Sequence, residues 1–164
     1  MNILIIDDDN IKKEKILSAL LSVYPDANVK WFENYQDANL FILDNHEYID
    51  LIILDWCFPP NSYSKSKYGM GRQILYSMLY NNINIKTIIS SSDVISINKE
   101  DFPDVLGSLN ILGKTNMQDQ LASYLNVQNY DVIDNNSKGK AKVRTNKQIN
   151  GYKRHLSSTP WWMK

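Results

Sequence analysis

The sequence predicts an α/β fold in which one doubly wound parallel sheet carries helices on both faces. Two aliphatic runs, residues 3–6 and residues 51–54, each end at an aspartate and are typical of strands buried on both faces. In the segments between such runs, apolar residues recur at the spacing of an amphipathic helix. Strands alternate with helices five times along residues 1–127, which indicates a five-stranded parallel sheet.

The first part of the chain predicts three strands and two helices. Pro25 ends the first helix. Asn34, with Asp37 three residues later, resembles the capping pair of a second helix. In order, the predicted elements are a strand at 3–6, a helix at 11–24, a strand at 29–32, a helix that begins near residue 34, and a strand at 51–54.

The second part begins with a polar loop at residues 61–69, which is long for a compact α/β domain. A helix with an apolar stripe follows it, formed by Ile74, Leu75, Met78 and Leu79. The remaining predicted elements are a strand at 87–91, a weak helix from 94 to about 101, a strand at 109–112, and a helix at 116–127.

The formal net charge of zero is a cancellation between two segments. The chain has 164 residues, with 18 basic and 18 acidic side chains. Residues 1–127 hold 10 basic and 16 acidic side chains, a net of −6, whereas residues 128–164 hold 8 and 2, a net of +6. Because the apolar periodicity fades after residue 127, we expect a folded domain at 1–127 and a basic, aromatic-ended tail at 128–164 without its own core.

Composition also restricts the cellular setting. No apolar run reaches the roughly 18 to 20 residues that a membrane-spanning helix needs, and no segment reads as a secretion signal. Cys57 is the only cysteine, so it has no internal disulfide partner, and no histidine pair stands near it to complete a zinc site. We therefore expect a soluble protein of the reducing cytoplasm.

Polar side chains stand where the predicted strands end. Asp7 and Asp8 follow the first strand, Asp55 follows the third, and Lys114 follows the last. The fourth strand ends in Ser90 and Ser91, and either hydroxyl could face the site. Ligands of an open α/β sheet bind beyond the carboxyl ends of its strands. Three carboxylates that meet there need a cation, and oxygen ligands of this kind suit Mg²⁺.

Asp55 is the expected nucleophile, because it lies at the tip of a buried strand and its carboxylate is ionised at pH 7. A hydroxyl and an ammonium group nearby would suit the oxygens of a phosphoryl group. The simpler interpretation is that acidic residues after strands cap the next helix, as Asp9 or Asn10 could here. Four polar positions in this chain order favour a phosphoryl-transfer site.

This pattern resembles the receiver domain of two-component response regulators over residues 2 to about 127. The resemblance implies a flavodoxin-like (βα)5 receiver fold, and the short tail suggests the stand-alone type rather than a complete transcription factor. The residues that carry it are the acid pair Asp7-Asp8, Asp55 with Pro59 four positions later, Gly71 with Ile74 and Leu75 behind it, Ser91, and Lys114.

The resemblance also implies a role for each site residue. Asp55 accepts phosphate from a histidine kinase or phosphotransfer protein. Asp8, Asp55 and the backbone carbonyl of Cys57 bind Mg²⁺, and Asp7 acts through water. Ser91 hydrogen-bonds a phosphoryl oxygen, with Ser90 as the alternative; strand alternation favours Ser91. Lys114 pairs with the phosphoryl group or, before phosphorylation, with Asp55.

Three features depart from the family pattern. Thr115 follows Lys114 where receivers usually have proline, and Ile111 stands where an aromatic residue usually responds to phosphorylation. The connection from Pro59 to Gly71 is several residues longer than usual. Its residues 60–69, the 60–69 insertion, could gate the site or dock a partner, or be a solvated insertion.

The predicted function is a switch rather than a conventional enzyme: Mg²⁺-dependent self-phosphorylation of Asp55, slow self-dephosphorylation, and a signal passed by protein contacts. One rival is a pseudo-receiver that keeps the fold without phosphorylation. Another is a nucleic-acid-binding protein that uses the basic residues of 138–154, with aromatic residues that could stack on bases. The tail could equally dock on its own receiver or on a partner, or be a flexible extension.

Overall fold

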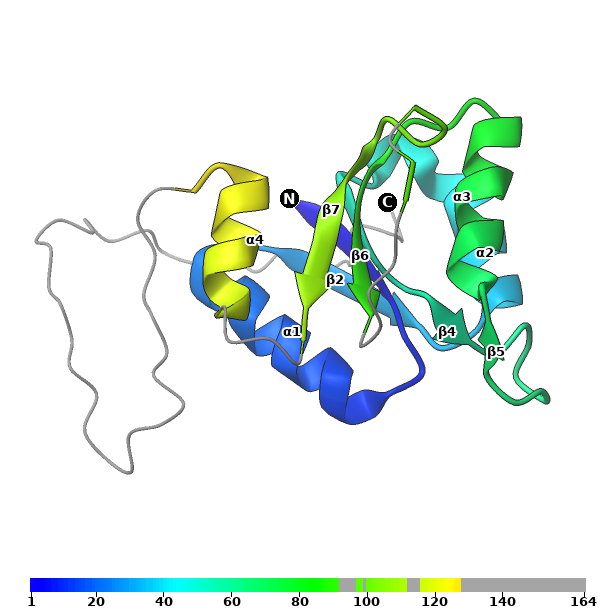
Figure 1. Cartoon of the computed structure of the whole chain (residues 1–164), viewed down its shortest axis with the longest axis horizontal. Coiled ribbons are helices and arrows are strands. Elements are labelled where there is room, and N and C mark those ends of the chain that lie inside the picture. Colours follow the sequence, from blue (N-terminus) through cyan, green and yellow to red (C-terminus); the bar gives the residue numbers. More distant parts are fainter. Residues whose placement is uncertain (92–96, 99, 112–115, 128–164) are drawn as a thin grey trace, which may run out of the picture.

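The computed structural model describes residues 1–91, 97–98, 100–111 and 116–127. Five parallel strands form one sheet in the order β2-β1-β3-β6-β7 (Figure 1). The order reverses between β1 and β3, which makes the carboxyl ends of these two strands the expected ligand position. The predicted doubly wound, five-stranded parallel sheet is confirmed. Its strands are β1 (Asn2–Ile6), β2 (Asn28–Phe32), β3 (Leu51–Asp55), β6 (Lys86–Ser91) and β7 (Val105–Asn110).

Helices cover both faces of this sheet (Figure 1). Helices α1 (Asn10–Val23) and α4 (Met117–Leu125) lie on one face. Helices α2 (Tyr35–Asn45) and α3 (Met70–Tyr80) lie on the other, and a short 3-10 turn, η1 (His46–Tyr48), follows α2. Among the described residues, no helix is both long and apolar enough to cross a bilayer.

The aliphatic runs are explained by burial on both faces. Ile3 and Ile5 of β1 pack in the core beneath α1 and α4, whereas Leu4 and Ile6 pack beneath α2 and α3. Strand β3 alternates in the same way and is buried at every position. Because each apolar side chain removed from water contributes about 1.5–3 kcal/mol, these two strands fix the centre of the sheet.

Side-chain caps set the starts of three helices. The carboxylate of Asp9 accepts hydrogen bonds from the backbone N–H groups of Ile11 and Lys12, so the capping interpretation of Asp9 is confirmed. Asn34 caps α2 by accepting from the N–H of Asp37, and its amide donates to the Asp37 carboxylate, as the sequence predicted. Asn116 begins α4 in the same manner. These bonds satisfy N–H groups that have no partner within the helix.

The predicted last strand at 109–112 is wrong in position, because β7 covers Val105–Asn110. Gly107 and Ser108 interrupt the apolar pattern of β7, so the pattern did not indicate where this strand begins. A methyl group on Gly107 would overlap the ring of Tyr124, which lies against the strand from α4. The glycine therefore reflects close helix–strand packing rather than a turn.

The predicted weak helix from Val94 to about Asp101 falls partly outside the described residues. Residues 97–98 and 100–101 are described and are not helical. The side chain of Asn98 accepts from the N–H of Glu100, and its carbonyl accepts from Asp101 and Phe102. This local turn competes with a helix, as asparagine side chains commonly do.

The predicted loop at 61–69 contains structure that the sequence pattern did not indicate. Two short strands, β4 (Cys57–Phe58) and β5 (Lys67–Tyr68), pair antiparallel and form a hairpin. This hairpin extends from the carboxyl end of β3 in Figure 1. The 60–69 insertion is thus held at its base beside the predicted site.

Candidate functional site

The acidic cluster forms where the strand order reverses. Asp7 directly follows β1, and Asp55 is the last residue of β3. Carboxylate oxygens of Asp7, Asp8 and Asp55 all lie within 4.8 Å of one another. Asp7 is fully buried and Asp55 is 7% exposed. The structure therefore brings the three predicted carboxylates together at the switch point of the sheet.

Lys12 lies inside this cluster, which sequence reasoning did not predict. Its Nζ is 2.8 Å from Oδ2 of Asp7 and 2.6 Å from Oδ1 of Asp55. The cap that Asp9 forms fixes the first turn of α1 and with it the direction of Lys12. The neighbouring Lys13 points elsewhere and pairs with Glu33 at 2.8 Å. One ammonium group thus bridges two carboxylates from different strands.

Burial governs the protonation of this cluster. Loss of hydration raises the pKa of Asp7 to about 6, and the hydrogen bond and positive charge of Lys12 only partly oppose this. Burial likewise raises the pKa of Asp55, again against the effect of Lys12. Burial by itself would lower the pKa of Lys12, but its contacts with Asp55 and Asp7 outweigh burial and raise it. Lys12 therefore stays charged, and the two carboxylates retain a need for positive charge.

Asp8 has a different partner, which comes from the 60–69 insertion. The hydroxyl of Ser66 donates a hydrogen bond to Oδ2 of Asp8. Ser66 directly precedes β5, so the hairpin holds it over the acidic cluster. Each of the three carboxylates is thus in contact with Lys12 or Ser66.

The loop after Asp55 is shaped by close backbone contacts. Backbone N–H groups of Trp56 and Cys57 donate to the Asp55 carboxylate. The carbonyl of Trp56 accepts from the N–H groups of Gly69 and Gly71. A methyl group on Gly71 would overlap the carbonyl oxygen of Asp55, which explains why glycine stands at the start of α3. Cys57 lies in β4, two positions past Asp55, and its role as a carbonyl ligand stays a prediction.

The register of β6 places Ser90 directly opposite Asp55 on β3. Ile53 and Ile88, which precede this pair on the same two strands, both pack on the α1 face. Strand alternation then puts Ser90 on the α1 face and Ser91 on the other. Among the described residues, the fully buried Oγ of Ser90 has no hydrogen-bond partner. The choice between Ser91 and Ser90 stays a prediction.

Lys114 and Thr115 lie outside the described residues, as does the tail at 128–164. Their predicted roles therefore remain predictions. Ile111 follows the end of β7 and is partly exposed. The effect of isoleucine in place of an aromatic residue at this position stays a prediction.

The acidic cluster fits a divalent cation. Three carboxylates face one ammonium group in a mostly buried space, so negative charge is in excess. Oxygen donors of this kind are what hard divalent ions such as Mg²⁺ prefer. The residues present are therefore suitable for divalent metal binding.

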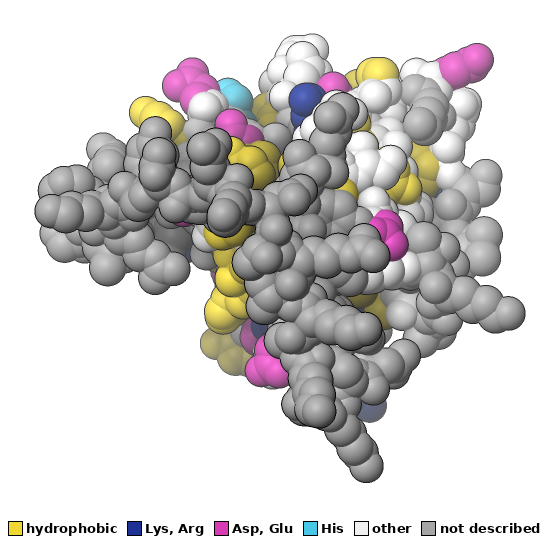
Figure 2. Space-filling model, turned by 90° about the vertical axis from the view of Figure 1, so that its left-hand side faces the viewer, with side chains coloured by type: hydrophobic (Ala, Val, Ile, Leu, Met, Phe, Trp, Pro, Cys, Tyr) yellow, Lys and Arg dark blue, Asp and Glu magenta, His cyan; other side chains and the backbone are white. Residues whose placement is uncertain are grey.

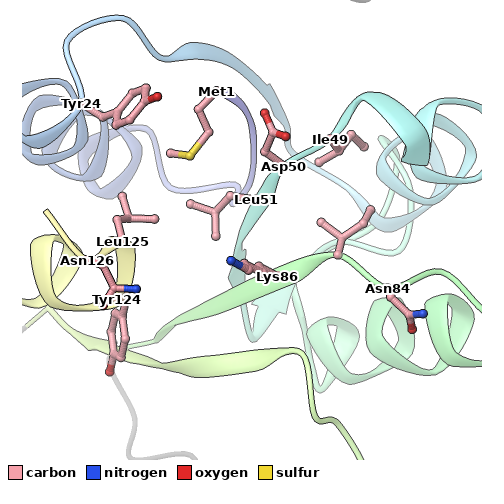
Figure 3. Close-up of a pocket in the computed structure, with 11 residues that line it drawn as sticks. Met1, Tyr24, Ile49, Asp50, Leu51, Asn84, Lys86, Tyr124, Leu125 and Asn126 are labelled. Carbon is pink, nitrogen blue, oxygen red and sulfur yellow. The ribbon is translucent and has the colours of Figure 1, made fainter.

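A separate cavity lies at the opposite end of the sheet. Its volume is about 620 Å³, and it lies between the start of β3, the start of β6 and the ends of α1 and α4 (Figure 3). Asp50 and Lys86 carry the charged side chains of its lining, which also includes Tyr24 and Tyr124. None of the predicted site residues lines it.

Acidic side chains appear at several places on the described part of the face shown in Figure 2. The described surface also exposes large apolar side chains, with Tyr63 of the 60–69 insertion 99% exposed.

Comparison with known proteins supports the fold. No family model and no curated protein matches this chain. Among solved structures, it is similar to the signal receiver domain of a putative LuxO repressor protein from Vibrio parahaemolyticus. That match has 20% identity, a TM-score of 0.54, and coverage of 76% of this chain and 86% of the other.

Two further structures give the same result. One is a DNA-binding response regulator of the LuxR family from Staphylococcus aureus, with 21% identity, a TM-score of 0.54, and coverage of 78% and 98%. The other is the Mn²⁺-bound form of response regulator Rcp1, with 20% identity, a TM-score of 0.50, and coverage of 77% and 90%. The chain therefore has the fold of response regulator receiver domains.

Sequence reasoning missed Lys12 and Ser66. Lys12 lies five residues after Asp7, which puts it in the first turn of a helix that starts beside the cluster. That spacing was a usable signal once the helix start was known. Ser66 gave no such signal, because its approach to Asp8 depends on the unpredicted β4–β5 hairpin.

Proposed function

We propose that this protein is a phosphoacceptor receiver that takes a phosphoryl group on Asp55 in a Mg²⁺-dependent reaction. The observation that carries the proposal is the meeting of Asp7, Asp8 and Asp55 at the switch point of a receiver fold. Asp55 lies at the tip of the central strand and is 7% exposed, whereas Asp7 is fully buried. Of these two carboxylates, Asp55 is the better placed to meet a donor.

The phosphoryl transfer to Asp55 needs no reactant other than the phosphodonor. A carboxylate oxygen of Asp55 attacks the phosphorus of a phosphohistidine or a small phosphodonor. A new O–P bond forms, the bond from phosphorus to the donor breaks, and no proton has to leave Asp55. Slow attack by water on the phosphorus later releases inorganic phosphate and restores the carboxylate.

Other residues hold and orient the groups. Asp7, Asp8, Asp55 and the carbonyl of Cys57 would hold Mg²⁺, which when bound supplies positive charge against the phosphoryl oxygens. Ser91 donates a hydrogen bond to a phosphoryl oxygen, with Ser90 as the alternative. The similar structure of Rcp1 was solved with Mn²⁺, which supports a divalent ion in this fold. Lys114 pairs with the phosphoryl group.

The partners follow from this chemistry. A histidine kinase or phosphotransfer protein supplies the phosphate in the cytoplasm, and a downstream protein reads the altered surface. The tail is proposed to act by contact with a partner or with the receiver itself rather than with nucleic acid.

The experiment is incubation of the protein with a small phosphodonor and Mg²⁺. Uptake of phosphate is expected for the wild type and absent for Asp55→Asn. Excess chelator should suppress uptake in the wild type. Equal labelling of both proteins would contradict the assignment.

A second candidate is a pseudo-receiver that works as an interaction module without phosphorylation. The specific observation in its favour is Lys12, which already bridges Asp7 and Asp55. This candidate predicts no Mg²⁺ binding by calorimetric titration. Saturable binding of Mg²⁺ would exclude it.

A further inference from the structure

Lys12 places its ammonium group between two carboxylates of the acidic cluster. Its ammonium nitrogen contacts Oδ2 of Asp7 and Oδ1 of Asp55 at 2.8 and 2.6 Å, and its side chain is only 13% exposed. A divalent ion bound by the same oxygens would be close to this ammonium group and repelled by it. Lys12 and the metal therefore compete for Asp7 and Asp55.

Ser66 contacts the third carboxylate of the cluster, that of Asp8. Its hydroxyl donates to Asp8, so a metal bound by that oxygen has to break the contact. Ser66 belongs to the 60–69 insertion, which is fixed at its base by the pairing of β4 with β5. Its outer part is exposed, as Tyr63 shows. Loss of the contact between Ser66 and Asp8 would free this outer part without unfolding the core.

We infer that Lys12 and Ser66 form an internal latch on the acidic cluster, which a divalent cation must open by displacing Lys12 and releasing the 60–69 insertion. The inference rests on the proposed function only for the metal site. In this latch, Lys12 lowers the affinity of the cluster for the metal. Ser66 couples metal binding to the conformation of the 60–69 insertion.

The first test is titration of Mg²⁺ into the full-length, chelator-treated protein. Lys12→Met is expected to bind Mg²⁺ about tenfold more tightly than the wild type, a difference of about 1.4 kcal/mol. Lys12→Gln checks that the gain does not depend on one substitution. Lys15→Met removes an exposed lysine of α1 and should leave the affinity unchanged. Unchanged or weaker binding in both Lys12 variants would overturn the inference.

The second test is limited proteolysis by trypsin, which can cleave after Lys65 and Lys67 in the insertion. In the wild type, Mg²⁺ should speed cleavage several-fold. Ser66→Ala should be cleaved fast with or without Mg²⁺, whereas Ser62→Ala, in the same insertion, should behave as the wild type. The same cleavage rate in the wild type with and without Mg²⁺ would overturn the role of Ser66.

These outcomes separate the latch from the proposed function. Tighter binding by the Lys12 variants without phosphorylation of Asp55 supports the latch and contradicts the function. Phosphorylation of the wild type, with no gain in metal affinity in the Lys12 variants, supports the proposed function and contradicts the latch. Absence of metal binding in every variant overturns the latch.

Discussion

The Nζ atom of Lys12 lies 2.6 Å from Oδ1 of Asp55, so the first turn of α1 is joined to the tip of β3. The same ammonium group reaches Asp7, which directly follows the neighbouring strand β1. The two strands at the switch point and the helix between them therefore share one charged centre. Changes at this centre should affect stability as well as chemistry.

Removal of Lys12 should destabilise the protein when no metal is present. Lys12→Met leaves two buried carboxylates without their counter-ion, and loss of one partner of a buried ion pair costs about 3–5 kcal/mol at most. Because the side chains of Lys12 and Asp55 keep 13% and 9% of their exposure, we expect a loss of about 2 kcal/mol in the free energy of unfolding, somewhat below that range. Urea denaturation in chelator measures it. Saturating Mg²⁺ should then stabilise the variant more than the wild type.

Neutralisation of Asp7 should have the opposite effect. Burial raises the pKa of Asp7 to about 6, above its value of 3.8 in an unfolded chain, so the ionised form costs stability above that range. Asp7→Asn keeps an oxygen for the N–H of Asp9. In chelator at pH 7.5 we expect a gain of about 1 kcal/mol in the free energy of unfolding.

The pH dependence supplies a check on Asp7. Between pH 4 and 6 the folded protein holds the Asp7 proton and the unfolded chain does not, so wild-type stability should fall relative to Asp7→Asn as the pH rises. The difference is measured by thermal unfolding in chelator. Parallel curves of stability against pH for the two proteins would show that Asp7 is not the group responsible. Asp26→Asn, at an exposed position, is the control and should give a curve parallel to that of the wild type.

Gly71→Ala should damage the site through the backbone. The added methyl group meets the carbonyl oxygen of Asp55 and must displace the loop or the start of α3. We expect a loss of about 2–3 kcal/mol, in the range of overpacked interiors, together with reduced phosphorylation. Gly69→Ala is the comparison: Gly69 has φ of +82° but open space around it, so only about 1 kcal/mol of backbone strain is expected. Equal losses in both variants would contradict the steric explanation.

Gly107→Ala should reveal the packing of α4 on β7. Its methyl group would overlap the ring of Tyr124, whose hydroxyl donates to the carbonyl of Ser108. We expect Gly107→Ala to destabilise the protein by about 2 kcal/mol. In the double variant with Tyr124→Ala the effect of the added methyl should be much smaller, which a double-mutant cycle measures. Additive effects would refute the contact.

Much of the fold could be predicted because its signals are local. The aliphatic runs of β1 and β3 are continuous, which is typical of strands buried on both faces. The caps at Asp9 and Asn34 bond to N–H groups only two or three residues away. Strand β7 was misplaced because the glycine at position 107 is explained by its close packing against Tyr124, a contact that is not local in the sequence. Leu79, assigned to an apolar stripe, is 54% exposed, because α3 buries Ile74, Leu75 and Met78 instead.

The site was predictable in part for the same reason. Asp7 and Asp55 end adjacent strands, and parallel strands bring their carboxyl ends together. The contacts of Lys12 and Ser66 depend on the direction of one helix turn and on a hairpin, neither of which leaves a periodic signal. Residue types at strand ends thus indicated the chemistry, whereas the internal partners of the carboxylates required the structure.

The phosphoacceptor assignment is tested most directly by locating the phosphoryl group. After treatment with a small phosphodonor and Mg²⁺, borohydride reduction of the acyl phosphate and peptide mapping by mass spectrometry should place the modification on Asp55 alone. Asp55→Asn should yield no modified peptide. Modification of another residue in the wild type, or none under conditions in which Mg²⁺ is bound, would contradict the account.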